Sequence, residues 1–160
     1  MMNSPICKML GIEFPLLAFS HCRDVVAAVS KAGGMGVFGA VNLPPHRLKE
    51  ELDWIDKHCA GKPYGVDLIV PNKMEGKSEP FNPNALLGAI PQEHKDFASG
   101  VLKGHGIDPG DLEADRATSV NFARNMREEG AAGSLEVAFQ YPIKLIANAL
   151  GVPPQVMLEM

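Results

Sequence analysis

Two pairs of neighbouring residues in this sequence have side chains that can bind zinc, His21-Cys22 and His58-Cys59. Zinc sites in proteins combine imidazole and thiolate ligands. The first pair follows a predicted strand, whereas the second ends a predicted helix of about 14 residues, about 21 Å long. The pairs are therefore expected at opposite ends of the fold, and we predict no metal site. His21 alone is a candidate for the rim of a ligand site, and a solvated loop histidine is the alternative.

A single carboxylate interrupts the apolar segment Tyr64–Val70, at Asp67. A buried carboxylate is unfavourable without a partner, so Asp67 is a candidate site residue. Ser20 ends another apolar segment and is a second candidate, with the alternative that its hydroxyl caps the helix that follows. The acidic residues between 108 and 115 lack the spacing and central glycine of a calcium loop, and we interpret them as a solvated helix start.

Alternating strand and helix patterns position these residues. The short apolar segments 14–19, 35–41, 64–70 and 143–150 predict buried strands. A helix from about Arg23 to Gly33-Gly34 has the predicted apolar face Val25, Ala28, Val29 and Ala32. A second helix from Leu43-Pro44-Pro45 to Gly61 has the apolar stripe Leu48, Leu52, Ile55 and Cys59. This order predicts an α/β fold whose parallel strands are joined by right-handed crossovers.

The strand pattern is interrupted between Pro71 and Gly133, where helices are predicted at 91–103 and 112–129. Further helices are predicted at 134–140 and from Gln155 onward. We expect one domain, residues 1–160, with a helical insertion at about 72–133 after strand three. Connections of this kind normally have about 2 to 6 residues, and long ones often serve as lids. We expect a lid over the site, with a peripheral decoration or an oligomer contact as the alternative.

The composition is that of a globular protein, with 160 residues, 46% hydrophobic residues, 21% charged residues and a net charge of −4. This charge disfavours a nucleic-acid-binding protein, and no apolar segment reaches the roughly 18 residues of a membrane span. We find no secretory signal and no cysteine framework for disulfides. We therefore expect a cytoplasmic protein that acts on a small molecule, without nucleic-acid or membrane partners. Its oligomeric state is not predicted.

Four segments of the sequence carry a resemblance to a known family. They are residues 5–17 (PICKMLGIEFPLL), 27–36 (AAVSKAGGMG), 62–68 (KPYGVDL) and 146–154 (IANALGVPP). These segments resemble the nitronate monooxygenases, formerly called 2-nitropropane dioxygenases. The resemblance implies a (β/α)8 TIM barrel, of which this chain is expected to provide the N-terminal half, with about four parallel strands. The end of the chain at Met160, one turn into a predicted helix, suggests a fragment or a truncated reading frame.

The resemblance also implies an FMN-dependent enzyme that oxidises nitronates with molecular oxygen. The residues that it places against the flavin are Ala18, Phe19, Ser20 and Asp67. The family's catalytic histidine lies in the second half and is expected beyond Met160, so no catalytic residue is assigned in this chain, which alone is expected to be inactive.

Two segments differ from the family pattern, at three positions. Ala18-Phe19-Ser20 stand where the family has Ala-Pro-Met, and Asp67 stands where it has Asn. An ionised Asp67 can accept a hydrogen bond but cannot donate one. These differences leave two other functions open: a flavin-dependent reductase resembling the enoyl reductases, and a non-catalytic remnant that pairs its open sheet edge with a partner.

Overall fold

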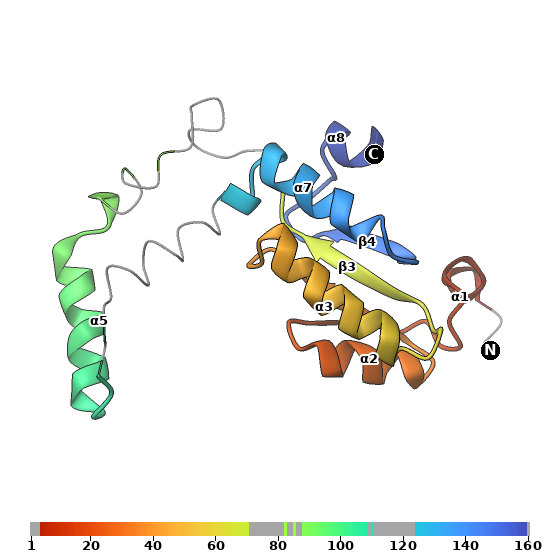
Figure 1. Cartoon of the computed structure of the whole chain (residues 1–160), viewed down its shortest axis with the longest axis horizontal. Coiled ribbons are helices and arrows are strands. Elements are labelled where there is room, and N and C mark those ends of the chain that lie inside the picture. The colour runs from red at the N-terminus through yellow and green to blue at the C-terminus, as the bar shows by residue number, and fades with distance from the viewer. Residues whose placement is uncertain are drawn as a thin grey trace. The chain divides into compact units, whose positions relative to one another are not determined.

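The structure is a computed structural model that describes residues 4–70, 82, 85, 88–108, 110 and 124–159, without the side chains of 128, 129 and 156. Its elements are α1 (Pro5–Leu10), β1 (Leu17–Ser20), α2 (Arg23–Lys31), β2 (Met35–Gly39), α3 (Pro45–His58), β3 (Tyr64–Leu68), α5 (Gln92–Gly104), α7 (Glu128–Ala138), β4 (Leu145–Asn148) and α8 (Gln155–Glu159) (Figure 1). They form two compact units. Residues 1–74 and 125–160 form the sheet unit, and residues 75–124 form the inserted unit.

The sheet unit contains four parallel strands in the order β1-β2-β3-β4. Helices α2, α3 and α7 are the crossovers that parallel strands require. The predicted α/β class and the four parallel strands are therefore confirmed, and the arrangement is consistent with part of a (β/α)8 barrel. Among the described residues, no helix is both long and apolar enough to cross a membrane.

Side chains of the strands alternate between two faces of the sheet. The face that we call the helical face packs against α2, α3 and α7. The opposite face, which we call the α1 face, carries Leu17, Phe19, Met35, Val37, Gly39, Gly65, Asp67, Leu145 and Ala147 in register. Cys7 and Leu10 of α1 pack with Ile12 against Met35 and Val37 at one end of this face.

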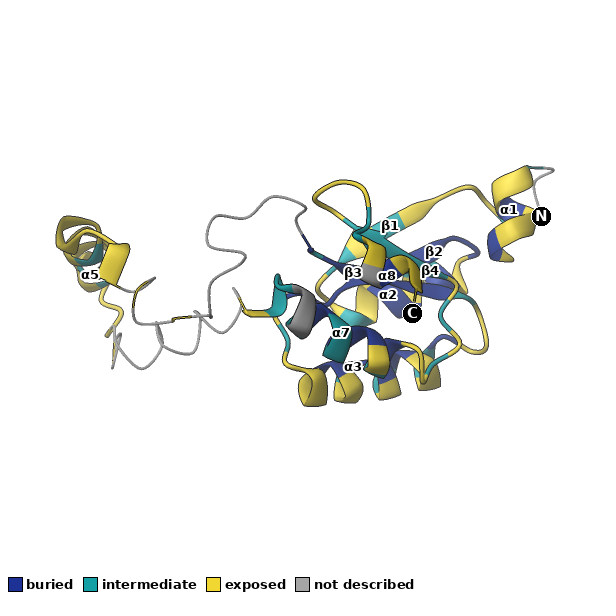
Figure 2. Ribbon diagram, turned by 90° about the horizontal axis from the view of Figure 1, so that it is seen from above, coloured by how far each residue is buried: buried dark blue, intermediate teal, exposed yellow. Residues whose placement is uncertain are grey.

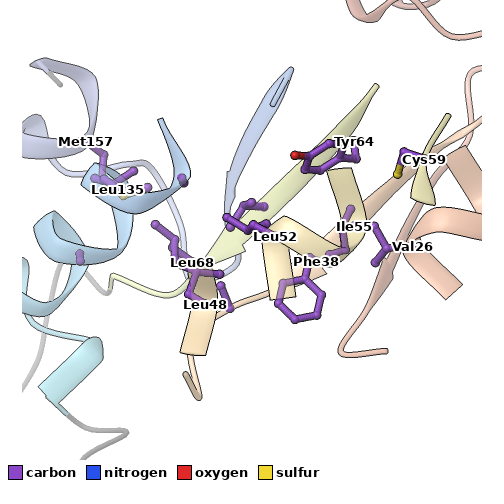
Figure 3. Packing of buried hydrophobic residues seen from close by; sticks show 14 of the residues in the cluster. Val26, Phe38, Leu48, Leu52, Ile55, Cys59, Tyr64, Leu68, Leu135 and Met157 are labelled. Carbon is purple, nitrogen blue, oxygen red and sulfur yellow. The ribbon is translucent and has the colours of Figure 1, made fainter. Parts of the chain in front are cut away.

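The core between the helical face and α3 is built by the stripe that the sequence predicts. Leu48, Leu52, Ile55 and Cys59 are all buried there against Phe38 and other strand residues (Figure 3). Figure 2 shows the buried side of α3 turned toward the sheet and its exposed side turned away. Burying one such side chain contributes about 1.5–3 kcal/mol, so this stripe fixes α3 on the sheet.

The apolar face predicted for α2 is wrong. The buried residues of this helix are Val26, Ala27 and Ser30, whereas Val25 is 45% exposed. The reason is a close approach between α2 and β2. Gly36 has no side chain, and a Cβ there would lie 2.6 Å from the Cα of Val26. The Gly36 N–H also donates a hydrogen bond of 3.1 Å to the buried Ser30 Oγ, which places a polar residue on the packed side.

The first strand also differs from its prediction. Strand β1 covers only Leu17–Ser20, and its residues are exposed or half-buried rather than buried on both faces. The preceding segment is held in a turn, because the N–H groups of Glu13 and Phe14 both donate to the carbonyl oxygen of Gly33. In the described sheet β1 is an outer strand, so only β2 covers its edge. Helix α1 was not predicted at all.

The remaining helices match the sequence to different degrees. Helix α5 confirms the helix predicted at 91–103. The helix predicted at 112–129 lies mostly outside the described residues. Helix α7 begins at Glu128 and ends at Ala138, earlier at both ends than the prediction of 134–140. Its buried residues Ala131, Leu135 and Ala138 recur at helical spacing in the core, which extends the helix across two glycines.

Candidate functional site

The candidate site lies where the strands end on the α1 face. Asp67 of β3 pairs in register with Gly39 of β2 and with Ala147 of β4. The carboxyl group is therefore flanked on the sheet by one residue without a side chain and one with a single methyl group. In parallel α/β folds ligands bind at the carboxyl ends of the strands. A ligand is therefore expected at this edge of the sheet.

Asp67 is a carboxyl group in a largely apolar environment. The residue is only 5% exposed, and in the described part of the chain its carboxyl group has no hydrogen-bond partner. Burial raises the pKa of Asp67 above its usual range, and the nearby charge of His21 opposes this effect. The carboxyl oxygens are not completely enclosed, since they are not among the fully buried, unpaired side-chain atoms of the described residues.

His21 lies beside this carboxyl and is fixed by two contacts. Its Nδ1 is 3.1 Å from the carbonyl oxygen of Gly39. Because a carbonyl oxygen can only accept, Nδ1 carries the proton in this bond, and Nε2 is left for another partner. The ring also meets Phe19 edge to face, with the centroids 5.0 Å apart at 81°. His21, a rim candidate from the sequence, thus lies at the site.

The four residues that the resemblance places against the flavin lie on two different faces of the sheet. Phe19 lies on the α1 face with Asp67 and is 57% exposed. Ala18 and Ser20 alternate to the opposite side of β1. The Ser20 hydroxyl accepts the N–H of Cys22 at 3.0 Å, so it stabilises the turn before α2. Their roles toward a flavin stay predictions.

Gly39 lies at the end of β2, and its missing side chain shapes the candidate site. A Cβ at Gly39 would lie 2.7 Å from the His21 ring and 2.7 Å from the Phe19 ring. The missing side chain therefore allows both rings to lie over β2 on the α1 face. The sequence signal was present, because Gly39 and Ala147 are small residues near the predicted strand ends, but the strand register was needed to place them beside Asp67.

Two asparagines fix the loops around the site. Asn148 at the end of β4 holds Val70 through both backbone groups, with its Oδ1 accepting the N–H at 2.9 Å and its Nδ2 donating to the carbonyl at 3.1 Å. Asn125 donates from Nδ2 to the carbonyls of Val41 and Leu43, at 2.9 and 3.1 Å. The chain therefore leaves β3 and returns to α7 at the same edge of the sheet.

The two zinc-type pairs have other contacts. The His58 Nδ1 bonds the carbonyl of Trp54 at 2.7 Å, and the His58 ring stacks on the Trp54 ring. Cys59 is buried on the helical face, whereas Cys22 is exposed. Across the described ranges, no group of three or more His, Cys, Asp or Glu residues could hold a metal ion.

The raised pKa of Asp67 predicts how stability depends on pH. Since the folded-state pKa exceeds the unfolded one, Asp67 costs no stability below its unfolded pKa, and its cost grows as the pH rises through the folded pKa. We expect Asp67→Asn to be isosteric and nearly neutral near pH 3, and to gain unfolding free energy relative to the wild type toward pH 7. Urea titrations at several pH values measure this difference.

Asp53→Asn is the matched control, because the pKa of Asp53 is shifted in the opposite direction to that of Asp67. The pKa of Asp53 is lowered by its hydrogen bond from Tyr141 and then by Lys49. This variant should lose stability at neutral pH, and the loss should fade in acid. A difference between Asp67→Asn and the wild type that is constant across the pH range would contradict the assignment of a buried, titrating carboxyl.

Comparison with known proteins adds the family context. No family model matches the chain. Over 159 residues, or 99% of the chain, it is 43% identical to the "Putative monooxygenase Rv1533" of Mycobacterium tuberculosis, of which it covers 42%. Over 87 residues, or 51% of the chain, it is 32% identical to the "Probable nitronate monooxygenase" of Staphylococcus aureus strains JH9 and Newman, of which it covers 24%. The chain thus spans less than half the length of these curated relatives. The resemblance found in the sequence motifs is confirmed, and the chain is a relative of proteins named as monooxygenases, including nitronate monooxygenases.

Proposed function

We propose that this chain is part of an FMN-dependent oxidoreductase that oxidises nitronates with molecular oxygen, and that its role is to bind the flavin ring on the α1 face. The observation that carries the proposal is Asp67, which is only 5% exposed, lies in register between Gly39 and Ala147, and has no hydrogen bond to its carboxyl group in the described part of the chain. The names of the relatives support the class of reaction.

The residues around Asp67 fit a flat heteroaromatic group. Ala147 leaves low surface on one side of the carboxyl, the His21 ring lies over Gly39 on the other side, and the exposed Phe19 ring lies on the same face. Aromatic rings pack against one another in offset or edge contacts. An ionised Asp67 can accept a hydrogen bond from the N–H of a pyrimidine ring. When bound, FMN would supply the electron-transfer chemistry, while these residues bind and orient it.

The proposal is tested in a chimera in which this chain replaces the matching part of the M. tuberculosis relative. We expect a yellow protein that releases FMN on denaturation. For the chain alone we expect weak binding, because such barrels hold the phosphate with loops after strands seven and eight. A folded, colourless chimera that does not bind added FMN would refute the cofactor.

A substitution in the same chimera tests the position of the flavin. Asp67→Asn should make the flavin reduction potential more positive, since a negative neighbour disfavours added negative charge. Asp53→Asn, in α3 on the other side of the sheet, is the control and should leave the potential unchanged. An unchanged potential in Asp67→Asn would mean that Asp67 does not face the ring.

The segment between β3 and α7 is proposed as a lid over this site. The positions of the two ends of this segment support the proposal. At its start, the backbone of Val70 is hydrogen-bonded to Asn148, and at its end Asn125 is hydrogen-bonded to the loop after β2. Both ends therefore lie at the carboxyl edge of the sheet. A segment that begins and ends there can exclude water from a bound ligand and select the substrate.

Deleting residues 75–124 tests the lid. Helix α7 packs on α3 within the sheet unit, so the deletion should spare it and leave that unit folded. With a short Gly-Ser linker in the chimera, we expect retained flavin and either faster reaction with oxygen or an altered substrate preference, measured by stopped-flow kinetics. Unchanged kinetics together with a changed oligomeric state would instead support an oligomer contact.

A further inference from the structure

We propose that His21 is a positioning residue of the Asp67 site: held over Gly39, it places an ionisable ring beside the buried carboxyl and keeps that carboxyl in its charged form for an N–H donor of the ligand. The ligand class is a ring that presents an N–H group, such as a cyclic imide. Its identity as a flavin rests on the proposed function, whereas the coupling between His21 and Asp67 does not.

The position of His21 depends on a residue without a side chain. The ring lies 2.7 Å from the position that a Cβ of Gly39 would take, and its Nδ1–H donates to the carbonyl of the same residue. Gly39 is the register partner of Asp67, so the imidazole and the carboxyl lie over neighbouring strands on one face of the sheet. Phe19 supports the ring from β1.

Among the described residues, His21 supplies the charge that acts on the Asp67 carboxyl. Both register neighbours of Asp67, Gly39 and Ala147, are uncharged. Among the described residues, His21 is the group whose charge lowers the pKa of Asp67, against the larger effect of burial. A protonated ring beside a buried carboxyl favours the ionised carboxylate. Without His21, burial alone would favour the neutral acid, which is a poorer acceptor for an N–H group.

The test is to titrate Asp67 in the 160-residue chain by carboxyl carbon NMR. The Asp67 signal is assigned by its loss in Asp67→Asn. His21→Ala removes the charge and the carbonyl contact, whereas His21→Gln removes the charge and keeps a side-chain N–H. We expect the midpoint of Asp67 to rise in both variants. Gly39→Ala, which must displace the ring, should shift the midpoint in the same direction. His46→Ala, another exposed histidine at the start of α3, should leave it unchanged.

A structural role alone predicts a different result. With a structural role alone, His21→Gln would have the same Asp67 titration midpoint as the wild type, because the contact to the Gly39 carbonyl is preserved. An Asp67 midpoint that is equal in the wild type and His21→Ala overturns the proposal. Because exposed His21 lies outside the core, its variants are expected to fold even if Gly39→Ala does not.

A second measurement addresses the ligand separately. At a pH between the Asp67 midpoints of the wild type and His21→Gln, FMN should bind the variant chimera about tenfold more weakly than the parent chimera. Equal affinity would overturn the part of the proposal that concerns the N–H donor. If neither chimera binds FMN, the proposed function fails, and the NMR titration still decides the coupling of His21 to Asp67.

Discussion

Gly36→Ala is expected to lower the free energy of unfolding of the sheet unit by about 3 kcal/mol or more, at the upper end of the range for overpacked cores. The added Cβ would lie 2.6 Å from the Cα and 2.7 Å from the carbonyl carbon of Val26. These are backbone atoms, so no side-chain rotation can relieve the contact. Helix α2 would have to move away from β2, which would also stretch the bond between Ser30 Oγ and the Gly36 N–H.

Tryptophan fluorescence measures this effect, because the sequence has one tryptophan, Trp54, and it lies in α3 of the sheet unit. The control is Gly133→Ala in α7, where the only described atom near the added Cβ is Pro45 Cγ at 3.4 Å. A helical glycine replaced by alanine should gain up to about 1 kcal/mol. If both variants unfold at the same urea concentration as the wild type, the close approach of α2 and β2 is wrong.

Leu52→Ala is expected to cost about 2–5 kcal/mol of unfolding free energy. Leu52 is fully buried between α3 and the strands, so its removal leaves a cavity as well as lost apolar contacts (Figure 3). Urea unfolding followed by the Trp54 signal gives the midpoint and the slope. The matched control is Leu158→Ala in α8, a leucine that is 65% exposed and should change stability by less than about 0.5 kcal/mol. Similar losses in the two variants would contradict the assignment of the core.

The contrast between α3 and α2 explains how much of the fold the sequence could predict. In α3 the buried positions are Leu48, Leu52 and Ile55, so apolar spacing identifies the packed side correctly. In α2 the packed side includes Ser30, whose hydroxyl pairs with a backbone N–H of the neighbouring strand. A pattern that counts only apolar residues therefore chose the wrong side. Helix α1 has six residues, too few for a periodic pattern to be detected.

The candidate site was predictable only in part. Asp67 could be found because a carboxylate in an apolar segment is unusual. Its association with His21 depends on the register of β2 against β3 and on the direction of a loop side chain. Neither follows from local sequence, since a shift of one residue would place Asp67 on the other face of the sheet.

The pair of asparagines that fixes the ends of the segment between Val70 and Asn125 has a consequence for how such a protein can change in evolution. For a flexible loop with closed ends, doubling its length costs only about 0.6 kcal/mol of closure entropy. The side chains of Asn125 and Asn148 anchor these ends to backbone groups of the sheet unit, independently of what lies between them. This edge can therefore accept modules of different size by recombination, with the strand register unchanged, and is the natural point for grafting a new substrate-selecting segment in protein engineering.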